Sequence, residues 1–438
     1  MRRAIIGVLV ITFGLLLTAC NTTEPPPDGQ AITLKLEDAS CTEAWIELTS
    51  TNLQLPTTIT LKQIDPAGDT KSQILNLTSK DSLLYIDSLL PNKNYQYQAS
   101  SIQHQVSSNE LSVTTMDTTS HNFTFETFTF GEHSSSVLYD VAIIDENNVL
   151  AVGEIYMNDS LGQPDPNAYN IVRWDGSEWN IGRIAFTGGC HIIYPPIRAI
   201  WAFSENDIWF ASGGSLVHYD GIEYYNDCSM NSIITPPLNK IWGTSSNDLY
   251  VVGSNGTIIR YNGNLWWRMG TVTTLDIIDI WGDFNWGLES IEVIAVGSNL
   301  YSGYDRIIIF INNNGLEILD DEDINFPLSG VWFISKKKYY VAGSGIYERH
   351  NLYESKWQNG PLDITNYYIF GIRGNDVNDI AAVGGNGEVI HFNGFSWKSF
   401  LEKTKLNYGN YYEVSIKNDV IVSVGQDSPQ AVITLGKR

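Results

Sequence analysis

The sequence predicts an all-β protein, with a small N-terminal β domain followed by a larger ring of repeated β-sheets. Three observations lead to this prediction. The 438 residues are rich in aromatic residues and glycine and contain only 17% charged residues, against about 25% in an average soluble domain. Near the N-terminus apolar and polar residues alternate with the period of two that a half-buried strand requires. After residue 119, a strand-turn-strand segment recurs seven times.

The charge balance of the chain is strongly acidic. It carries 49 acidic and 26 basic residues, for a formal net charge of −23 at pH 7. Proteins that bind nucleic acid present a basic surface, because binding displaces the counterions of the phosphates. We therefore expect no nucleic-acid partner, and a tight surface patch for anionic lipids is disfavoured for the same reason.

The first 19 residues have the pattern of a signal peptide. Arg2 and Arg3 precede an apolar run over residues 4–17, which is too short to span a bilayer comfortably. The run ends in Leu-Thr-Ala-Cys at residues 17–20, which resembles a bacterial lipobox. This resemblance implies cleavage before Cys20 and acylation of Cys20. The alternatives are an uncleaved anchor and an ordinary secretory signal.

The lipobox resemblance also implies a location. An acylated cysteine with more than one chain anchors a protein stably to a membrane. Asn21 differs from the aspartate that resembles an inner-membrane retention signal. We therefore expect a lipoprotein of the bacterial envelope, in the outer membrane, on its periplasmic face or at the cell surface. Residues 20–30 contain three consecutive prolines and are expected to form an extended tether.

Residues 31–117 are predicted to form the first domain. Residues 32–36, 45–48 and 57–61 alternate as short strands do. Residues 86–99 contain Leu-Leu-Pro followed by Tyr-Gln-Tyr, which resembles the tyrosine-corner segment of fibronectin type III domains. The resemblance implies an Ig-like sandwich in which Tyr95 bonds to the backbone upstream. We expect this domain to act as a spacer.

Residues 119–438 contain an internal repeat. Residues 200–213, 241–253 and 372–384 each read as a strand, a polar Asn-Asp turn, a second strand and a glycine. Seven repeats align on an aliphatic residue of the first strand: Val141, Ile200, Ile241, Ile280, Val331, Ile372 and Val414. They also align on a closing glycine: Gly153, Gly213, Gly253, Gly297, Gly343, Gly384 and Gly425. The spacing of about 45 residues suits one four-stranded blade of a β-propeller.

A third set of positions completes the blade. Four repeats carry Asp-Gly or Asn-Gly between two β segments, a strong hairpin signal, at residues 175–176, 220–221, 262–263 and 393–394. Seven repeats of four strands predict a seven-bladed β-propeller, with six or eight blades as alternatives. The last repeat stops after three strands. We expect residues 123–130 to close the ring as the outer strand of the seventh blade.

The repeats also resemble a known group of proteins. Residues 242–266 read Trp-Gly-x-Ser-x-Asn-Asp-Leu-Tyr-Val-Val-Gly and then a Tyr-Asn-Gly hairpin with a tryptophan. This resembles repeats of secreted bacterial propellers, loosely related to sialidase-type (BNR/Asp-box) and photosystem-assembly propellers. The Asp-box itself, Ser-x-Asp-x-Gly-x-x-Trp, is not matched. Similar lipoproteins carry glycosyltransferase-like names, but no residue pattern here indicates sugar transfer.

Motifs for catalysis or metal binding are not found in the sequence. It contains no Gly-x-Ser-x-Gly, His-Glu-x-x-His or Cys-x-x-Cys motif, and its seven histidines are scattered. We therefore expect no catalytic residue, no metal site and no cofactor. The acidic run at residues 320–323 and the insert at residues 158–167 are alternative calcium sites, since calcium prefers several oxygen ligands. Both are more simply interpreted as solvated loops.

The arginines fall into two groups. Arg173 and Arg260 occupy the third-strand position at which other repeats carry His218 and His391. A residue type that recurs at one repeat position indicates blade packing or edge solvation. Arg198 and Arg373 lie in or beside first strands, nearer the propeller axis, and are candidate ligand contacts.

Cysteines and tryptophans also occupy equivalent positions. Cys190 and Cys228 lie in the same connection of consecutive repeats and could form a disulfide in an exported protein; the alternative is two free thiols. Cys41 is then unpaired and is expected to be buried in the first domain. One tryptophan column is interpreted as core between blades or, alternatively, as a platform for stacking sugars: Trp201, Trp242, Trp281 and Trp332.

The candidate binding site is the mouth of the central channel, where the first strands begin. These positions carry Tyr139, Arg198, Asn239, Phe370 and Tyr412, and Tyr and Arg are favoured contact residues at interfaces. We expect a noncatalytic binding or assembly module for an envelope protein or polysaccharide. The alternatives are a carbohydrate-active enzyme (glycosidase, lyase or glycosyltransferase-like), which needs paired carboxylates in a pocket, and a purely structural spacer.

Overall fold

A computed structural model of the chain describes residues 29–188, 191–227, 232–270, 272–285, 289–299, 304–312, 315–353, 356–360 and 364–438. This part of the chain is all-β apart from one helical turn, α1 (Leu401–Thr404). It divides into two compact units, the first built mainly from residues 44–86 and 94–114 and the second mainly from residues 115–438. No helix among the described residues is long and apolar enough to cross a membrane.

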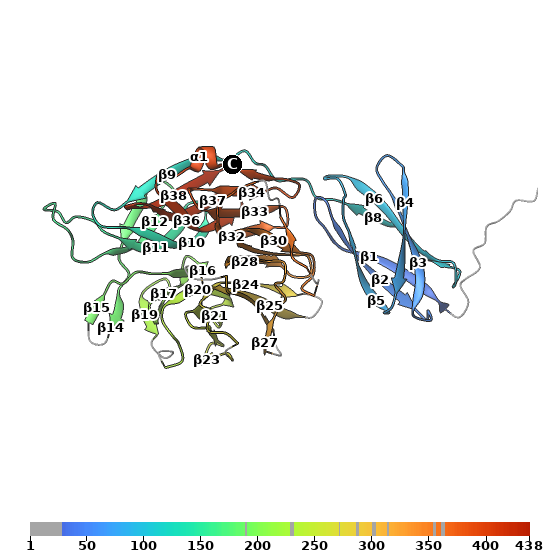
Figure 1. Cartoon of the computed structure of the whole chain (residues 1–438), viewed down its shortest axis with the longest axis horizontal. Coiled ribbons are helices and arrows are strands. Elements are labelled where there is room, and N and C mark those ends of the chain that lie inside the picture. Colours follow the sequence, from blue (N-terminus) through green and yellow to red (C-terminus); the bar gives the residue numbers. More distant parts are fainter. Residues whose placement is uncertain are drawn as a thin grey trace, which may run out of the picture. The chain divides into compact units, whose positions relative to one another are not determined.

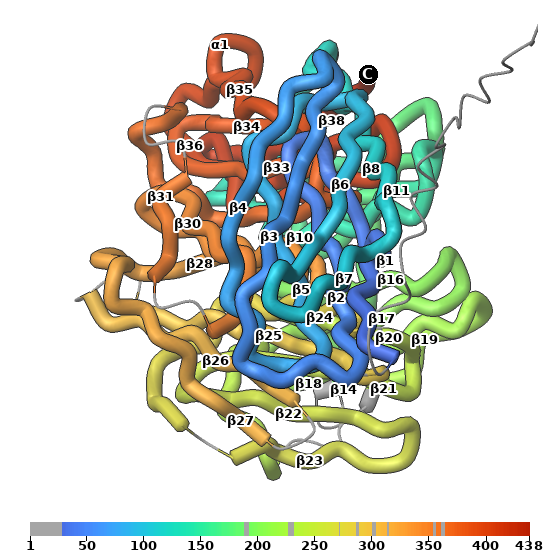
Figure 2. Tube along the Cα trace, turned by 90° about the vertical axis from the view of Figure 1, so that its right-hand side faces the viewer, coloured from blue at the N-terminus to red at the C-terminus, as the bar shows by residue number. Residues whose placement is uncertain are grey.

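The first unit contains two antiparallel sheets (Figure 1). The three-stranded sheet has the order β1 (Ala31–Ala39), β2 (Ala44–Thr51) and β5 (Asp81–Ile86). The other has the order β4 (Thr70–Leu77), β3 (Thr57–Ile64), β6 (Asn94–Ser101) and β7 (Val106–Ser107), with β8 (Leu111–Thr114) on β6. Figure 2 shows β4, β3 and β6 side by side. Trp45, Leu48 and Tyr97 are buried in this unit, and Tyr95 is buried on β6 opposite Val113 of β8.

The second unit contains seven four-stranded antiparallel sheets in its described part, which we call sheets 1 to 7. Sheets 1 to 3 consist of β10 (Val137–Asp145), β11 (Asn148–Ile155), β12 (Tyr169–Trp174) and β13 (Trp179–Gly182); β16 (Ala199–Ser204), β17 (Asp207–Ser212), β18 (Ser215–Tyr219) and β19 (Tyr224–Asp227); and β20 (Leu238–Ser245), β21 (Asp248–Gly253), β22 (Thr257–Tyr261) and β23 (Trp266–Arg268). A short hairpin of β14 (Phe186–Gly188) and β15 (His191–Ile193) lies between sheets 1 and 2 in the chain.

Sheets 4 to 7 repeat the same order. They consist of β24 (Ile277–Asn285), β25 (Ser290–Ser298), β26 (Arg306–Asn312) and β27 (Gly315–Ile318); β28 (Leu328–Ile334), β29 (Lys338–Gly343), β30 (Gly345–Arg349) and β31 (Gln358–Asn359); β32 (Ile369–Asp376), β33 (Asp379–Gly384), β34 (Val389–Phe392) and β35 (Trp397–Ser399); and β36 (Gly409–Lys417), β37 (Val420–Asp427) and β38 (Gln430–Lys437) with β9 (Thr124–Phe130).

The first strands of the seven sheets follow one another in a closed cycle of contacts. Each contacts the first strand of the next sheet, and β36 contacts β10. Figure 1 shows these strands in the middle of the unit, with β19, β23 and β27 at its periphery. β9 pairs with β38 along its length, from Thr124 opposite Lys437 to Phe130 opposite Ala431. This is the pairing predicted for residues 123–130, and it joins the two ends of the unit in one sheet.

The hydrophobic core lies between neighbouring sheets. One buried cluster joins sheets 7 and 1 through Val141, Val422 and Ile433, all less than a tenth exposed. Because each sheet presents apolar residues on both faces, each face is covered by the next sheet in the cycle. The apolar strands of each repeat are therefore stabilised by the sheets on either side, and the closed cycle leaves no sheet with an uncovered face.

Two of the repeat positions contact each other, which explains why they occur together. The glycine of each Asp-Gly or Asn-Gly hairpin has a positive φ, for example 92° at Gly221 and 88° at Gly263. A Cβ atom at these glycines would collide with the asparagine of the first turn, Asn206 or Asn247 respectively. The two turns of one sheet therefore pack against each other, and glycine is required for both its conformation and its size.

Arg260, His218 and His391, at the third-strand position of their repeats, contact aspartates of their own sheets. Nε2 of His218 lies 2.8 Å from Asp207, Arg260 lies 3.0 Å from Asp248, and Nε2 of His391 lies 2.7 Å from Asp379. Each aspartate is the first residue of the second strand of the same sheet, directly after the first turn. These contacts support the packing interpretation of this position.

Several sequence predictions fall on residues outside the described part. Residues 1–28, with the predicted signal peptide and Cys20, lie there, as do Cys190 and Cys228. The flanks of the two cysteines are described, and the backbone N–H of Thr187 donates to the Asn226 side chain at 2.8 Å. Cys41 is a buried free thiol, as expected, but its segment, residues 39–43, belongs to the second compact unit and not to the first.

Candidate functional site

A cavity of about 570 Å³ opens where the first strands of the seven sheets begin. One residue from each sheet lines it, always two positions before the aliphatic residue that aligns the repeats. We call this set the mouth residues: Tyr139, Arg198, Asn239, Ile278, Ser329, Phe370 and Tyr412. The structure thus brings together all five residues that the sequence analysis singled out. Their role in binding stays a prediction.

Sequence reasoning missed Ile278 and Ser329, although they occupy the same repeat position. Both residue types are unremarkable as ligand contacts, so only the alignment of repeats could have found them. In six of the seven sheets the pairing of the first and second strands shifts by one residue at this position. Such a β-bulge leaves one residue unpaired and re-aims its side chain. In sheet 2, Arg198 stands directly before β16.

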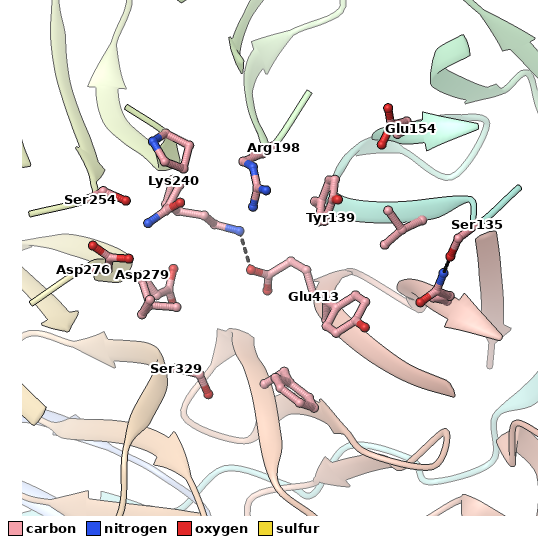
Figure 3. Close-up of a pocket in the computed structure, with 17 residues that line it drawn as sticks. Ser135, Tyr139, Glu154, Arg198, Lys240, Ser254, Asp276, Asp279, Ser329 and Glu413 are labelled. Atoms are coloured by element: carbon pink, nitrogen blue, oxygen red, sulfur yellow. Dashed lines mark hydrogen bonds and ion pairs between the residues drawn. The ribbon is translucent and has the colours of Figure 1, made fainter. Parts of the chain in front are cut away.

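The mouth residues of sheets 6, 7, 1 and 2 form an aromatic wall that ends in an arginine. The rings of Phe370 and Tyr412 meet edge-to-face with their centroids 5.5 Å apart, and the centroid of the Tyr368 ring lies 4.9 Å from that of Phe370. The guanidinium carbon of Arg198 lies 4.9 Å from the centroid of the Tyr139 ring. Figure 3 shows Arg198 and Tyr139 side by side at the rim of the cavity.

The opposite wall is polar and tied to the backbone. The Asn239 side chain donates to the carbonyl of Ile277 at 2.9 Å, and the Ser329 hydroxyl donates to the carbonyl of Ile369 at 2.7 Å. Each of these bonds crosses to the next sheet. The polar mouth residues therefore hold neighbouring sheets together as well as lining the cavity.

A buried network of five charged residues, which we call the ion cluster, lies beneath the cavity: Asp140, Lys240, Asp279, Arg373 and Glu413. Three of them, Lys240, Asp279 and Glu413, line the cavity. Lys240 lies 2.7 Å from Asp140 and also contacts Glu413 (Figure 3). Arg373 bonds both oxygens of Asp279, at 2.7 and 2.8 Å, and Glu413 at 3.2 Å. Each of the five is less than a tenth exposed.

The carboxylates of the ion cluster also accept hydrogen bonds from backbone N–H groups of first strands. Asp140 accepts from Ile200, and Asp279 accepts from Val331, each at 2.9 Å and each from the following sheet. Glu413 accepts from the adjacent Val414 at 3.0 Å. First strands have one unpaired edge, so these carboxylates satisfy donors that would otherwise be buried without a partner.

Burial and pairing compete in setting the protonation of the ion cluster. Burial disfavours charge on Lys240, but Asp140 and Glu413 outweigh it and raise the pKa of the lysine. The pKa of Arg373 is likewise raised by Asp279 and Glu413 against the effect of burial. Burial raises the pKa of Glu413, although Arg373 and Lys240 oppose the shift. Both cations are therefore charged at neutral pH.

Arg373, considered above as a candidate ligand contact, does not line this cavity. Its guanidinium is engaged by Asp279, Glu413 and the carbonyls of Val331 and Ile372. It borders a second, smaller cavity of about 250 Å³ at the other ends of the first strands. Lys240 lines both cavities, so the ion cluster separates them.

The tryptophan column divides between core and second cavity. Trp242 packs against Gly282 and Trp332 packs against Gly374, where a Cβ atom would collide with the indole ring. At the position equivalent to Gly282 and Gly374, Trp281 meets Phe333 in place of a glycine. The Nε1–H of Trp281 donates to the backbone carbonyl of Phe333 at 3.2 Å. Trp201 and Trp281 line the second cavity with their rings 5.8 Å apart. The core interpretation thus holds for two of the four.

The two candidate calcium sites are occupied by internal contacts. Asp321 pairs with Arg306 at 2.9 Å in the acidic run, and Asp165 pairs with Arg183 at 2.6 Å in the insert. The backbone N–H of Asn167 and the Arg183 contact hold the pKa of Asp165 below its usual value. Among the described residues no three His, Cys, Asp or Glu side chains gather as a metal site.

Comparison with known proteins shows the class of fold. No protein family model and no curated protein matches the chain. Among solved structures the chain is similar to YCF48 bound to D1 peptide, with a TM-score of 0.52 and 15% identity over 72% of this chain and 97% of that one. It is also similar to YCF48 from Cyanidioschyzon merolae (TM-score 0.47, 13% identity, 70% and 98% covered). A third is the extracellular domain of BT4673 from B. thetaiotaomicron (TM-score 0.49, 11% identity, 70% and 39% covered). At these identities the likeness shows the fold alone, an all-β fold of the β-propeller type.

Proposed function

We propose that the protein is a noncatalytic binding module that holds a peptide segment of a protein partner in the mouth of its channel. The observation that carries this proposal is the cavity of about 570 Å³ to which every sheet contributes one side chain at the same repeat position. A cavity of this size, with an aromatic wall and a few polar groups, suits a short peptide segment. YCF48, the first of the similar structures, was solved with a peptide.

The proposal includes the finer architecture. The closed cycle of seven sheets supports a seven-bladed β-propeller. The sheet orders β1-β2-β5 and β4-β3-β6-β8 support a fibronectin type III-like sandwich over residues 31–117, acting as a spacer. The lipobox at residues 17–20 supports a lipid anchor at Cys20, with residues 20–30 as the tether. We place the protein in the bacterial outer membrane with an envelope protein as its partner.

The carbohydrate-active alternative requires carboxylates that can reach a substrate. Asp279 and Glu413 line the cavity, and burial raises the pKa of Glu413, as in a general acid. Both oxygens of each carboxylate already accept hydrogen bonds from Arg373, Lys240 or the backbone. A catalytic acid or nucleophile needs a free oxygen at the reacting bond, so neither Asp279 nor Glu413 suits that role. The other two lining carboxylates are Glu154, which accepts from the Tyr156 hydroxyl, and Asp276, which accepts from the backbone N–H of Asn255.

The test is affinity purification of the full-length lipidated protein from its own membranes, followed by mass spectrometry of proteins and glycans. We expect a stoichiometric protein partner that is lost from the double variant Tyr139→Ala/Tyr412→Ala. The matched control is Tyr225→Ala/Tyr353→Ala, which removes two exposed tyrosines outside the cavity and should retain the partner. Recovery of glycan without protein would reassign the cavity to polysaccharide and call for a hydrolysis assay.

A further inference from the structure

We propose that Arg198 anchors a carboxylate of the bound peptide, and that the preferred carboxylate is the C-terminus of a chain that ends in an apolar or aromatic residue. This inference rests on the proposed function, since it names the chemical group that the cavity recognises. It concerns the side chain of Arg198, whose surroundings differ from those of Lys240, the other cationic residue that lines the cavity.

Arg198 is the one lining cation of the described cavity without an acidic partner. The cavity has two cationic residues, Arg198 and Lys240. Lys240 is buried and held by Asp140 and Glu413. Arg198 is exposed, and within the described part of the chain its guanidinium forms no ion pair and no hydrogen bond. A ligand with an anionic group therefore finds a free partner at this position only.

The contact with Tyr139 orients the guanidinium for this task. The guanidinium carbon lies 4.9 Å from the centroid of the Tyr139 ring, so the tyrosine ring supports the cation without using its N–H donors. These donors point outward in the plane of the group and match the two oxygens of a carboxylate. Because the ring restrains the side chain before binding, less conformational entropy is lost when the carboxylate arrives.

The charges around Arg198 select a singly charged anion. Glu154, Asp276, Asp279 and Glu413 also line the cavity. In the ion cluster three carboxylates face two cations, so its charge does not add attraction for an anion. A phosphate group, with nearly two negative charges, would be repelled by these carboxylates. A carboxylate carries one charge and can be balanced by Arg198 alone.

The apolar wall next to Arg198 indicates what accompanies the carboxylate. Tyr139, Tyr412 and Phe370 belong to consecutive sheets and follow Arg198 around the mouth. A side chain on this wall buries apolar surface against rings that are only partly covered in the free protein. A C-terminal residue carries its carboxylate one carbon away from such a side chain. An internal Asp or Glu also offers a carboxylate, but it has no apolar side chain on the carbon next to that carboxylate.

The experiment measures binding of four small probes to the full mature protein by NMR titration. They are N-acetyl-phenylalanine, its C-terminal amide, N-acetyl-aspartic acid α-amide and galacturonic acid. We expect N-acetyl-phenylalanine to bind at least tenfold more tightly than its amide and than the aspartate probe. Arg198→Gln should abolish the difference between acid and amide. The control Arg173→Gln changes an exposed arginine on β12, outside the cavity, and should preserve it.

The possible outcomes distinguish a C-terminal carboxylate from an internal acidic residue and from an acidic polysaccharide as the ligand of Arg198. Equal binding of acid and amide, or a difference that survives Arg198→Gln, overturns the proposal. Tighter binding of the aspartate probe assigns the site to an internal acidic residue and overturns the C-terminal preference. Tighter binding of galacturonic acid assigns it to an acidic polysaccharide. If acid and amide bind alike while Tyr139→Ala/Tyr412→Ala still loses its protein partner, the binding function stands and only the role of Arg198 falls.

Discussion

The ion cluster makes a prediction about stability that is large enough to measure. Replacing Arg373 by methionine keeps most of the side-chain volume but removes the cation between Asp279 and Glu413. The guanidinium donates to both Asp279 oxygens at 2.7 and 2.8 Å and to Glu413 at 3.2 Å. All three side chains are less than a tenth exposed, so the two remaining carboxylates are left close together with little water to screen them.

The expected cost follows from the effect of breaking a buried ion pair. Removing one partner of such a pair costs about 3–5 kcal/mol, because the other charge stays buried without compensation. For a unit of this size, we expect the thermal midpoint to fall by roughly 4–7 °C. Tryptophan fluorescence during heating reports on the second unit, since all tryptophans except Trp45 follow residue 119. The control Arg173→Met, at an exposed position on β12, should change stability by less than about 0.5 kcal/mol.

A double variant distinguishes lost charge balance from lost packing. Arg373→Met with Asp279→Asn removes one charge of each sign, and the asparagine oxygen can still accept from the backbone N–H of Val331. We expect the double variant to regain at least half of the stability that the single variant loses. The reasoning is refuted if Arg373→Met costs less than about 1 kcal/mol, or if the two substitutions are simply additive.

Three further measurements test other parts of the chain. Burial, together with the neighbouring His391, lowers the pKa of His121 to about 4. In the unfolded chain His121 is protonated near pH 6.5. The free energy of unfolding should therefore be highest above pH 6.5 and decrease as the pH falls from 6.5 to 4, and this decrease should be less steep in His121→Gln. Gly282→Ala places a methyl group against the Trp242 ring and should cost about 1–3 kcal/mol. If Cys190 and Cys228 are bonded and Cys20 is acylated, alkylation of the unfolded mature protein should modify one cysteine before reduction and three after it.

Each of these measurements has its own control. Gly270→Ala meets no atom within 4 Å and should leave the unfolding midpoint unchanged. A His121→Gln variant with the same acid sensitivity as the unaltered protein would contradict the role given to this histidine. Three cysteines alkylated without reduction would show that the predicted disulfide is absent, and four would show in addition that Cys20 is not acylated.

Much of the candidate site could be predicted from the sequence because it follows the repeat. Residues at one repeat position take the same place in every sheet, so aligning the repeats also aligned five residues that line one cavity. The same alignment would have added Ile278 and Ser329 if residue type had been ignored. The partners of His218, Arg260 and His391 could have been found in the same way, because each bonds the aspartate that begins the second strand of its own sheet.

The ion cluster could not be predicted, because its members do not repeat. Lys240 and Asp140 are separated by 100 residues, and Arg373 and Asp279 by 94. Each sheet places its first strand at the channel, but only the closed cycle determines which side chains meet across it. Arg373 occupies the tryptophan position of its repeat and was therefore considered a candidate ligand contact. Its guanidinium is instead held beneath the cavity by carboxylates of other sheets.

The strands, their turns and the order of the sheets are properties of the sequence, because period-two alternation and Asn-Gly or Asp-Gly turns act over a few residues. The outcome at a single position depends on what the neighbouring sheet presents. Trp242 packs in the core because Gly282 leaves room for its ring, whereas Trp281 is displaced toward the second cavity because Phe333 fills the equivalent space. Local chemistry thus determines which residues lie at the ends of the first strands, and contacts between sheets that are distant in the sequence decide which of these residues remain free to bind.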